Sequence, residues 1–189
     1  MTSRAIDLSG IELAGIHHAA YRCHNAAETV AWYQRVLGMR YVTAFAEDHV
    51  PSTGAYDPYM HVFLDAGNGN VVAFFELPQQ PPMGRDANTP AWVQHLALRV
   101  PRRAALLSAK ARIEAEGVDV LGPTWHGIFE SIYFFDPNGH RLELTADTGT
   151  AEQYAELERV APLMLEEWER TKQAPRHADW LHSKPGDGA

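Results

Sequence analysis

Two short segments of the chain start alike and lead into the same order of local patterns. HAAYR begins at His18, and HLALR begins at His95. Each segment has the length and apolar character of a buried strand, and each is followed by a helical stretch, residues 26–36 in the first and 103–116 in the second. Both helical stretches end at a glycine, which suits a left-handed C-terminal cap. An internal repeat constrains the fold strongly, because each copy should form the same unit.

Both copies also finish on an apolar strand with one interior glutamate. VVAFFEL contains Glu76, and HRLELT contains Glu143. The His-to-Glu spacing is 58 residues in the first copy and 48 in the second, and the difference fits the polar, turn-rich stretch 47–59, which we interpret as a loop. The order of patterns is therefore βαβββ, twice. Two matching pentapeptides can arise by chance, but the parallel His and Glu positions favour duplication.

The repeat predicts an α+β fold. We expect one domain over residues 1–149, built from two βαβββ modules at about 15–78 and 92–147, with a proline-rich linker at 79–91. Residues 150–189 form a C-terminal helical extension. A chain of 189 residues has the size expected for one such domain.

The extension has the pattern of an amphipathic helix. Apolar side chains recur at steps of three and four residues: Tyr154, Leu157, Ala161, Met164 and Trp168. We expect Pro162 to break this helix or to open a second one at its first turn. The helices should cover a flank of the sheet or form a dimer contact, and residues 182–189 should be frayed.

Charge and composition exclude some classes of partner. The chain has 24 acidic and 16 basic residues, a net charge of −8, which disfavours a nucleic-acid partner. Its longest apolar run, residues 71–75, is far shorter than the roughly 18 residues of a membrane helix, and no signal-peptide core is evident near the start. A single cysteine, Cys23, fits a reducing compartment. We therefore expect a cytoplasmic protein with no membrane or nucleic-acid partner.

The repeated His and Glu residues predict a metal site. A glutamate in an apolar strand is costly to bury alone, and two such strands, each matched with a His-bearing strand, suggest that His18, Glu76, His95 and Glu143 converge. Two imidazoles and two carboxylates suit one divalent ion, and Fe²⁺, Mn²⁺, Ni²⁺, Co²⁺ or Zn²⁺ would all be accepted. Each residue taken singly could be structural. His17 competes with His18, but only His18 keeps the repeat in register.

Strand alternation adds candidates for substrate binding. Arg22 shares a face with His18, and Arg99 shares one with His95, so both arginines are candidate substrate-binding residues. Glu76 lies on the same face as Phe74, which we expect to line an apolar cavity for an aromatic substrate.

Four stretches of the chain resemble the vicinal oxygen chelate superfamily, over roughly residues 15–147. These are AWYQRVLGM after His18, FFELP around Glu76, QHLALRV around His95, and SIYFFDPNGHRLEL ending in Glu143. The superfamily includes glyoxalase I, extradiol ring-cleaving dioxygenases, and bleomycin or fosfomycin resistance proteins. The resemblance implies that the paired modules form a cup-shaped mixed sheet with the metal inside. The tail beyond residue 150 has no counterpart in it.

The second module resembles an extradiol dioxygenase most. That resemblance implies a facial triad of His18, His95 and Glu143 on Fe²⁺ or Mn²⁺, with open positions for a catechol and O₂. Tyr133 would position the bound catecholate, and His126 would donate or accept a proton. The substrate would be aromatic, or at least carry adjacent oxygens.

Two departures keep other functions open. Dioxygenases have a small residue in place of Glu76 and a catalytic histidine where this chain has Asn70. If Glu76 binds the metal, the four-ligand set resembles glyoxalase-type isomerases or lyases, in which Glu76 would act as general base on an enediolate and Arg22 would hold a substrate carboxylate. A third possibility is a non-catalytic protein that binds a flat drug. A homodimer is expected in each case, because such modules leave sheet edges and apolar faces to cover.

Overall fold

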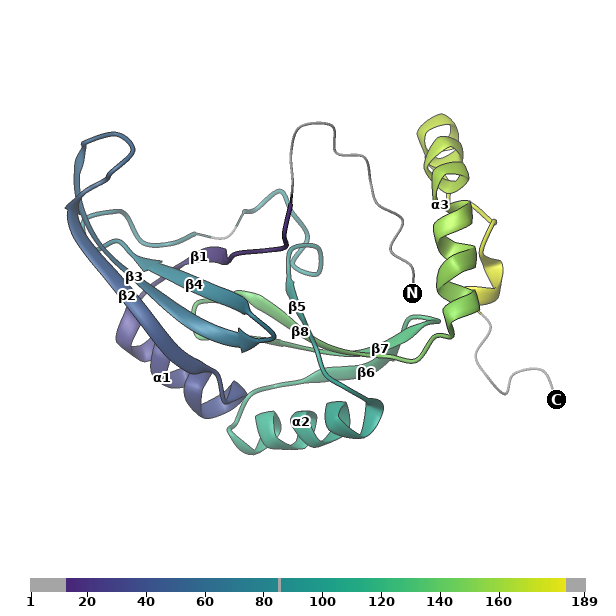
Figure 1. The fold of residues 1–189 in the computed structure, drawn as a ribbon, viewed down its shortest axis with the longest axis horizontal. Coiled ribbons are helices and arrows are strands. Elements are labelled where there is room, and N and C mark those ends of the chain that lie inside the picture. The colour runs from purple at the N-terminus through teal and green to yellow at the C-terminus, as the bar shows by residue number, and fades with distance from the viewer. Residues whose placement is uncertain (1–12, 85, 183–189) are drawn as a thin grey trace. The chain divides into compact units, whose positions relative to one another are not determined.

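The computed structural model describes residues 13–84 and 86–182, which fall into two compact units, Met1–Met83 and Gly84–Ala189. Each unit contains one four-stranded mixed sheet with a helix on one face, so the predicted α+β fold with two βαβββ modules and a C-terminal helix is confirmed (Figure 1). The boundary between the units falls inside the predicted linker. We call the units the first and second modules.

The first module contains five elements, in the order β1 (Ala19–Cys23), α1 (Ala26–Leu37), β2 (Arg40–His49), β3 (Tyr56–Gly67) and β4 (Asn70–Glu76). Its strands lie in the order β1-β4-β3-β2, with β1 parallel to β4 and the other pairs antiparallel.

Helix α1 defines the core face of the first sheet. The Asn25 side chain accepts a hydrogen bond from the Glu28 N–H and begins the helix, and Gly38 ends it at a φ of 69°. Tyr33 on the helix and Phe74 on β4 are both fully buried, with ring centroids 4.9 Å apart. Even-numbered residues of β4 therefore face α1, and odd-numbered residues lie on the opposite face, which we call the open face.

The second module repeats this plan. Its elements are β5 (Leu96–Arg99), α2 (Arg103–Ala115), β6 (Leu121–Trp125), β7 (Phe129–Phe135) and β8 (Arg141–Asp147). The strand order is β5-β8-β7-β6, and β5 is parallel to β8. The side chains buried between sheet and helix are Leu106, Ile113, Ile132, Phe134 and Leu142.

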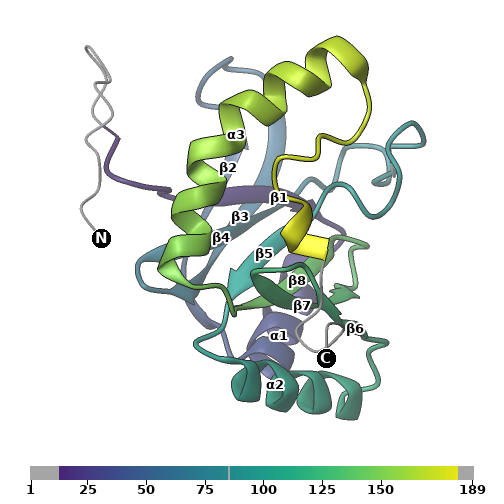
Figure 2. The same cartoon turned by 90° about the vertical axis from the view of Figure 1, so that its right-hand side faces the viewer.

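The C-terminal extension corrects one expectation. Helix α3 (Ala151–Thr171) is continuous through Pro162, followed by the short helix η1 (Asp179–His182). A proline in a helix interior removes one backbone N–H donor and commonly causes a bend. In this protein α3 bends along its length and does not stop at Pro162 (Figure 2). Of residues 182–189, which we expected to be frayed, His182 is the last residue of η1, and 183–189 lie outside the described residues.

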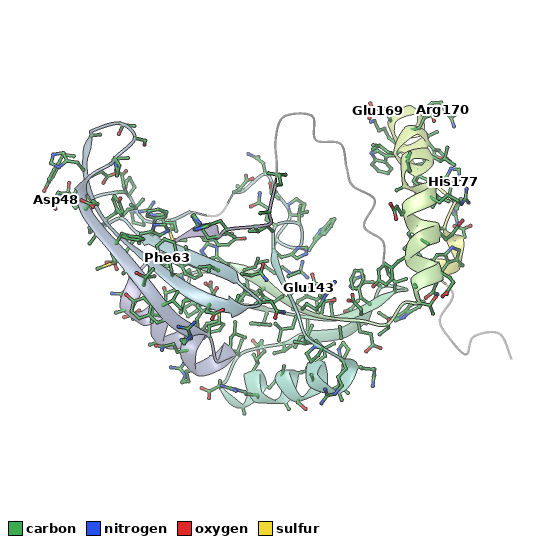
Figure 3. The ribbon with its side chains drawn as sticks, viewed as in Figure 1. Asp48, Phe63, Glu143, Glu169, Arg170 and His177 are labelled. Carbon is green, nitrogen blue, oxygen red and sulfur yellow. The ribbon has the colours of Figure 1, made fainter. Side chains whose placement is uncertain are left out.

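The segment that follows α3, up to residue 182, folds back on its own module. His177 lies beside α3 (Figure 3), with its Nε2 2.8 Å from Oε2 of Glu167 on that helix. Leu181 packs so closely on Gly127 that a Cβ at Gly127 would meet it at 2.6 Å. Within the described part of the chain, no helix combines the length and apolarity needed to cross a membrane.

Candidate functional site

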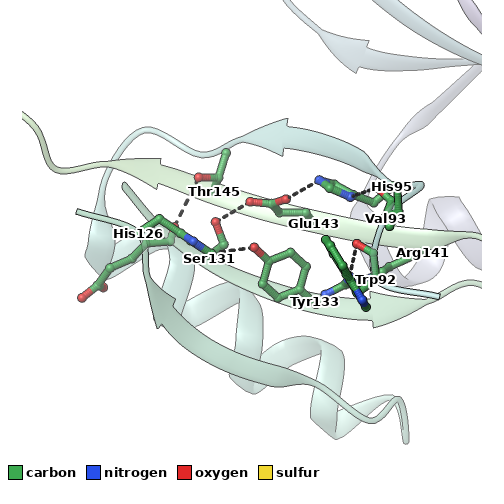
Figure 4. A network of polar contacts seen from close by, with 10 residues as sticks. Trp92, Val93, His95, His126, Ser131, Tyr133, Arg141, Glu143 and Thr145 are labelled. Carbon is green, nitrogen blue, oxygen red and sulfur yellow. Dashed lines mark hydrogen bonds and ion pairs between the residues drawn. The ribbon is translucent and has the colours of Figure 1, made fainter. Parts of the chain in front are cut away.

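The second module brings His95 and Glu143 into direct contact. Glu143 lies in the middle of β8, on the face opposite α2, with only 4% of its surface exposed (Figure 3). His95 immediately precedes β5, whose Ala97 pairs with Glu143 in the parallel register. His95 Nε2 lies 3.0 Å from Glu143 Oε2 (Figure 4). The structure therefore brings together two of the four side chains that were expected to converge, His95 and Glu143.

The other nitrogen of His95 fixes the tautomer of the ring. His95 Nδ1 lies 2.9 Å from the Val93 carbonyl oxygen, which can only accept, so Nδ1 carries the proton. In the neutral imidazole, the lone pair of Nε2 then faces a carboxylate oxygen. Two acceptors at this distance repel unless a proton or a cation lies between them. The pair is therefore suited to bind a metal ion, with Val93 orienting the ring.

Ser131 fixes the second oxygen of Glu143. Its hydroxyl, fully buried on β7, donates a hydrogen bond to Glu143 Oε1 (Figure 4). This leaves Oε2 as the oxygen that faces His95. Sequence reasoning missed Ser131, although alternation along FESIYFF places it on the same face as Tyr133.

Tyr133 and His126 form a second polar pair on the same face of this sheet. Tyr133 is opposite Glu143 in the β7–β8 register, and its hydroxyl lies 2.8 Å from His126 Nε2. Burial raises the pKa of Tyr133, so the phenol keeps its proton at neutral pH. The Arg141 guanidinium lies over the Tyr133 ring, 4.2 Å from its centroid. The predicted catalytic residues Tyr133 and His126 thus lie together with Glu143.

In the first module, His18 lies just before β1 on the open face. Its ring centroid is 5.6 Å from that of Phe63 and 6.0 Å from that of His61. His17 Nδ1 and His18 Nδ1 are 2.7 Å apart, so the two histidines are neighbours. Arg22 lies on β1 opposite Phe75, on the same open face. Its guanidinium donates a hydrogen bond to the Pro81 carbonyl oxygen.

Glu76 lies on the other face of the first sheet. Its neighbour Phe75 stacks on His61 on the open face, with ring centroids 3.5 Å apart. Glu76 Oε2 accepts a hydrogen bond of 2.6 Å from the Ala26 N–H, at the start of α1. The expectation that Glu76 and His18 converge is therefore not met within this module. The reason is local: strand alternation turns Glu76 toward α1, whose N-terminus favours a negative charge.

One predicted substrate-binding residue also differs from expectation. Phe74 was expected to line a cavity, but it is fully buried beneath α1 against Tyr33. The apolar pattern of β4 does not by itself distinguish the two faces, and the helix covers this one. Arg99 lies 3.2 Å from Asp147 in an exposed ion pair.

His61 is a candidate that sequence reasoning missed. It lies on β3 on the open face with His18, it is 9% exposed, and its Nε2 is buried with no hydrogen-bond partner among the described residues. Burial and the neighbouring His18 lower the pKa of His61, which favours the neutral ring. A histidine in the otherwise apolar run YMHVFL was the available signal.

The predicted metal ligands are divided between the modules. His18 and Glu76 are in the first, and His95 and Glu143 are in the second. Among residues 13–84 and 86–182, no group of three or more His, Cys, Asp or Glu side chains could hold a metal ion. Of the four predicted ligands, only His95 and Glu143 are in direct contact within one module.

The family model of the Glyoxalase/Bleomycin resistance protein/Dioxygenase superfamily matches residues 15–144. The chain belongs to this superfamily. The resemblance inferred from the sequence is thereby confirmed.

Individual relatives within the superfamily are distant. The chain is 29% identical over 140 residues to the "Putative ring-cleaving dioxygenase MhqA" of Bacillus subtilis (strain 168), covering 72% of this chain and 42% of that protein. The chain thus spans less than half the length of this relative. The fosfomycin resistance protein FosX from Listeria monocytogenes has a TM-score of 0.52 at 22% identity, covering 75% of this chain and 98% of FosX. An integron cassette protein, HFX_CASS4, from the mobile metagenome of Halifax Harbour has a TM-score of 0.51 at 26% identity, covering 71% and 99%.

The superfamily includes dioxygenases, glyoxalases and fosfomycin-modifying enzymes, so membership makes a small-molecule enzyme plausible without choosing its reaction. The choice among these reactions depends on the residues of this chain.

Proposed function

We propose that this protein is a metal-dependent dioxygenase that cleaves the ring of a catechol-type substrate. The observation that carries the proposal is the position of Glu76. A four-ligand site would favour glyoxalase-type chemistry, and Glu76 is instead hydrogen-bonded to the Ala26 N–H on the α1 side of its sheet. The remaining ligands are His18, His95 and Glu143, which leave more positions of an octahedral ion for substrate and O₂.

The residues present fit a divalent metal. His95 Nε2 faces Glu143 Oε2 at 3.0 Å, and the partners of each side chain, Val93 and Ser131, hold these atoms in place. We propose Fe²⁺ or Mn²⁺, with His18 as the third ligand; FosX, of the same fold, has been solved with Mn(II). When bound, the metal would supply Lewis acidity and one-electron redox chemistry for the reaction of a catechol with O₂.

Two side chains of the second module would orient the substrate and transfer protons. Tyr133, which keeps its proton, would donate a hydrogen bond to a substrate oxygen and hold the ring in place. His126, 2.8 Å from the Tyr133 hydroxyl, would exchange a proton through it.

Similarity to MhqA supports this assignment, because that relative is described as a putative ring-cleaving dioxygenase. The homodimer expected from the sequence remains a prediction.

Metal content and O₂ uptake test the proposal. Protein purified without O₂ is expected to hold Fe or Mn at one ion per chain, or to take it up on reconstitution, and to consume O₂ when catechols are added. Uptake should not require glutathione. Proton transfer on a glutathione adduct with no O₂ consumption would instead establish the isomerase alternative, and a protein that binds no metal and turns over neither class of substrate would be a binding protein.

A further inference from the structure

The second module contains a cavity beside Tyr133 to which the proposed reaction assigns no role. Its volume is about 900 Å³, within the range of roughly 300–1,000 Å³ typical of small-molecule sites. It lies where β6 and β8 begin and β7 ends. We call it the Arg141 pocket and define it by the residues that carry the argument: Trp92, Val120, Leu121, Tyr133, Phe135 and Arg141.

The walls of the Arg141 pocket are largely apolar and aromatic. Trp92 is 68% exposed, Leu121 66% and Phe135 43% within this module. When a ligand covers these three apolar side chains, their surface is removed from water, which makes the free energy of binding more favourable. Trp92 and Phe135 offer flat faces, so the shape and chemistry suit a planar aromatic body.

One side of the pocket carries a positive charge held in a fixed orientation. Arg141 donates a hydrogen bond to the Trp92 carbonyl oxygen and lies over the Tyr133 ring at 4.2 Å (Figure 4). A guanidinium has five N–H donors in a planar fork, more than this one bond uses. Such a group recognises a carboxylate through paired hydrogen bonds. The acids that line the pocket, Glu114 and Asp119, come from the end of α2 and the following loop and would repel an anion there.

We propose that the Arg141 pocket binds an aromatic carboxylate, with the ring against Trp92 and Phe135 and the carboxylate on Arg141. Tyr133 is shared between this pocket and the His95–Glu143 pair. The inference therefore rests on the proposed function in one respect: it makes the substrate a catechol whose aromatic body carries an acid group. Recognition of the acid itself does not depend on metal or O₂.

Binding of two matched probes tests the proposal by titration calorimetry on the full chain, with and without added metal. The probes are 2-naphthoate and its neutral methyl ester. The wild type is expected to bind the acid about ten-fold more tightly than the ester, with or without metal. Arg141→Gln should remove this preference, whereas Arg103→Gln, which removes a charge paired with Glu130 outside the pocket, should retain it.

Further variants keep the test decisive if Arg141→Gln fails to fold. Arg141→Lys should keep part of the preference for the acid, and Trp92→Ala should weaken both probes by similar factors. Equal affinities of the two probes for the wild type, or a preference that persists in Arg141→Gln, would overturn the proposal. If the preference behaves as expected and no catechol is cleaved, the pocket stands and the dioxygenase function fails.

Discussion

Glu76 and Ala26 are joined by a hydrogen bond of 2.6 Å from the Ala26 N–H to Glu76 Oε2, which ties the end of β4 to the first turn of α1. The first N–H groups of a helix have no partner within the helix, and a carboxylate there satisfies one of them and interacts favourably with the helix dipole. Glu76 therefore has a structural role on the face of the sheet away from His18.

Replacement of Glu76 by glutamine should consequently leave metal binding intact. The amide oxygen can still accept from Ala26, but the charge at the helix terminus is lost, so we expect the free energy of unfolding to fall by roughly 0.5–1 kcal/mol. Metal content by elemental analysis should be unchanged. Glu143→Gln is the matched control and should lose the metal; loss of metal in Glu76→Gln would restore the four-ligand site and with it the isomerase.

Ser131 provides a test of how Glu143 is held. Ser131→Ala removes the hydroxyl that donates to Glu143 Oε1, and we expect metal affinity to fall by about ten-fold or more. Ser131→Thr retains a hydroxyl and should recover most of this affinity. Metal titration with a competing chelator measures both, and equal affinities of the wild type and Ser131→Ala would show that the hydroxyl does not position the carboxylate.

Tyr133→Phe separates substrate positioning from metal binding. The variant keeps the ring beneath Arg141 but loses the hydroxyl that lies 2.8 Å from His126. We expect kcat for a catechol to fall by about a hundred-fold, since a positioned proton donor contributes roughly 10²–10⁴ in rate, with metal content unchanged. Steady-state kinetics on metal-loaded protein checks this, and a kcat within two-fold of the wild type would exclude Tyr133 from the reaction.

The Tyr154 hydroxyl links α3 to the second sheet, and replacing it tests how much that link contributes to stability. The hydroxyl is 3.2 Å from the Ile128 carbonyl oxygen and 3.1 Å from Asp147 Oδ1, and burial, followed by the contact with Asp147, raises its pKa. Tyr154→Phe should lower the free energy of unfolding by about 1 kcal/mol at neutral pH. A raised folded-state pKa means that the stabilisation is complete below the ordinary pKa near 10 and is lost above it.

The gap in melting temperature between the wild type and Tyr154→Phe should therefore be present at pH 8 and shrink as pH rises past 10. Thermal unfolding, followed by circular dichroism at pH 8 and above pH 10, measures this gap. A gap that is absent at pH 8 would mean that hydrogen bonding by the Tyr154 hydroxyl contributes nothing to stability.

The sequence predicted the two modules well because two independent periodicities agreed in each copy. Strand alternation around His95 and Glu143 and the capping glycines after each helix specify the same local structure twice. Both signals depend only on residues that are close in sequence. Such local patterns are enough to determine which residues share a face of one strand.

The errors arose where a second element decides the outcome. Alternation correctly grouped Glu76 with Phe74, but only the packing of α1 on that face shows that both are directed away from His18. His61 was missed because its significance comes from His18, just before β1, and from Phe75 on β4 rather than from its own strand. Pro162 was expected to break a helix or to open a second one, but α3 continues through it.

The most direct test of the account is the fate of labelled oxygen. Metal-loaded protein is incubated with a catechol under ¹⁸O₂, and the product is examined by mass spectrometry. Ring cleavage by a dioxygenase places both atoms of one O₂ molecule in the product, so we predict a mass gain of two labelled oxygen atoms that is absent in His95→Ala. A product without label, or labelled to the same extent in His95→Ala, would contradict it.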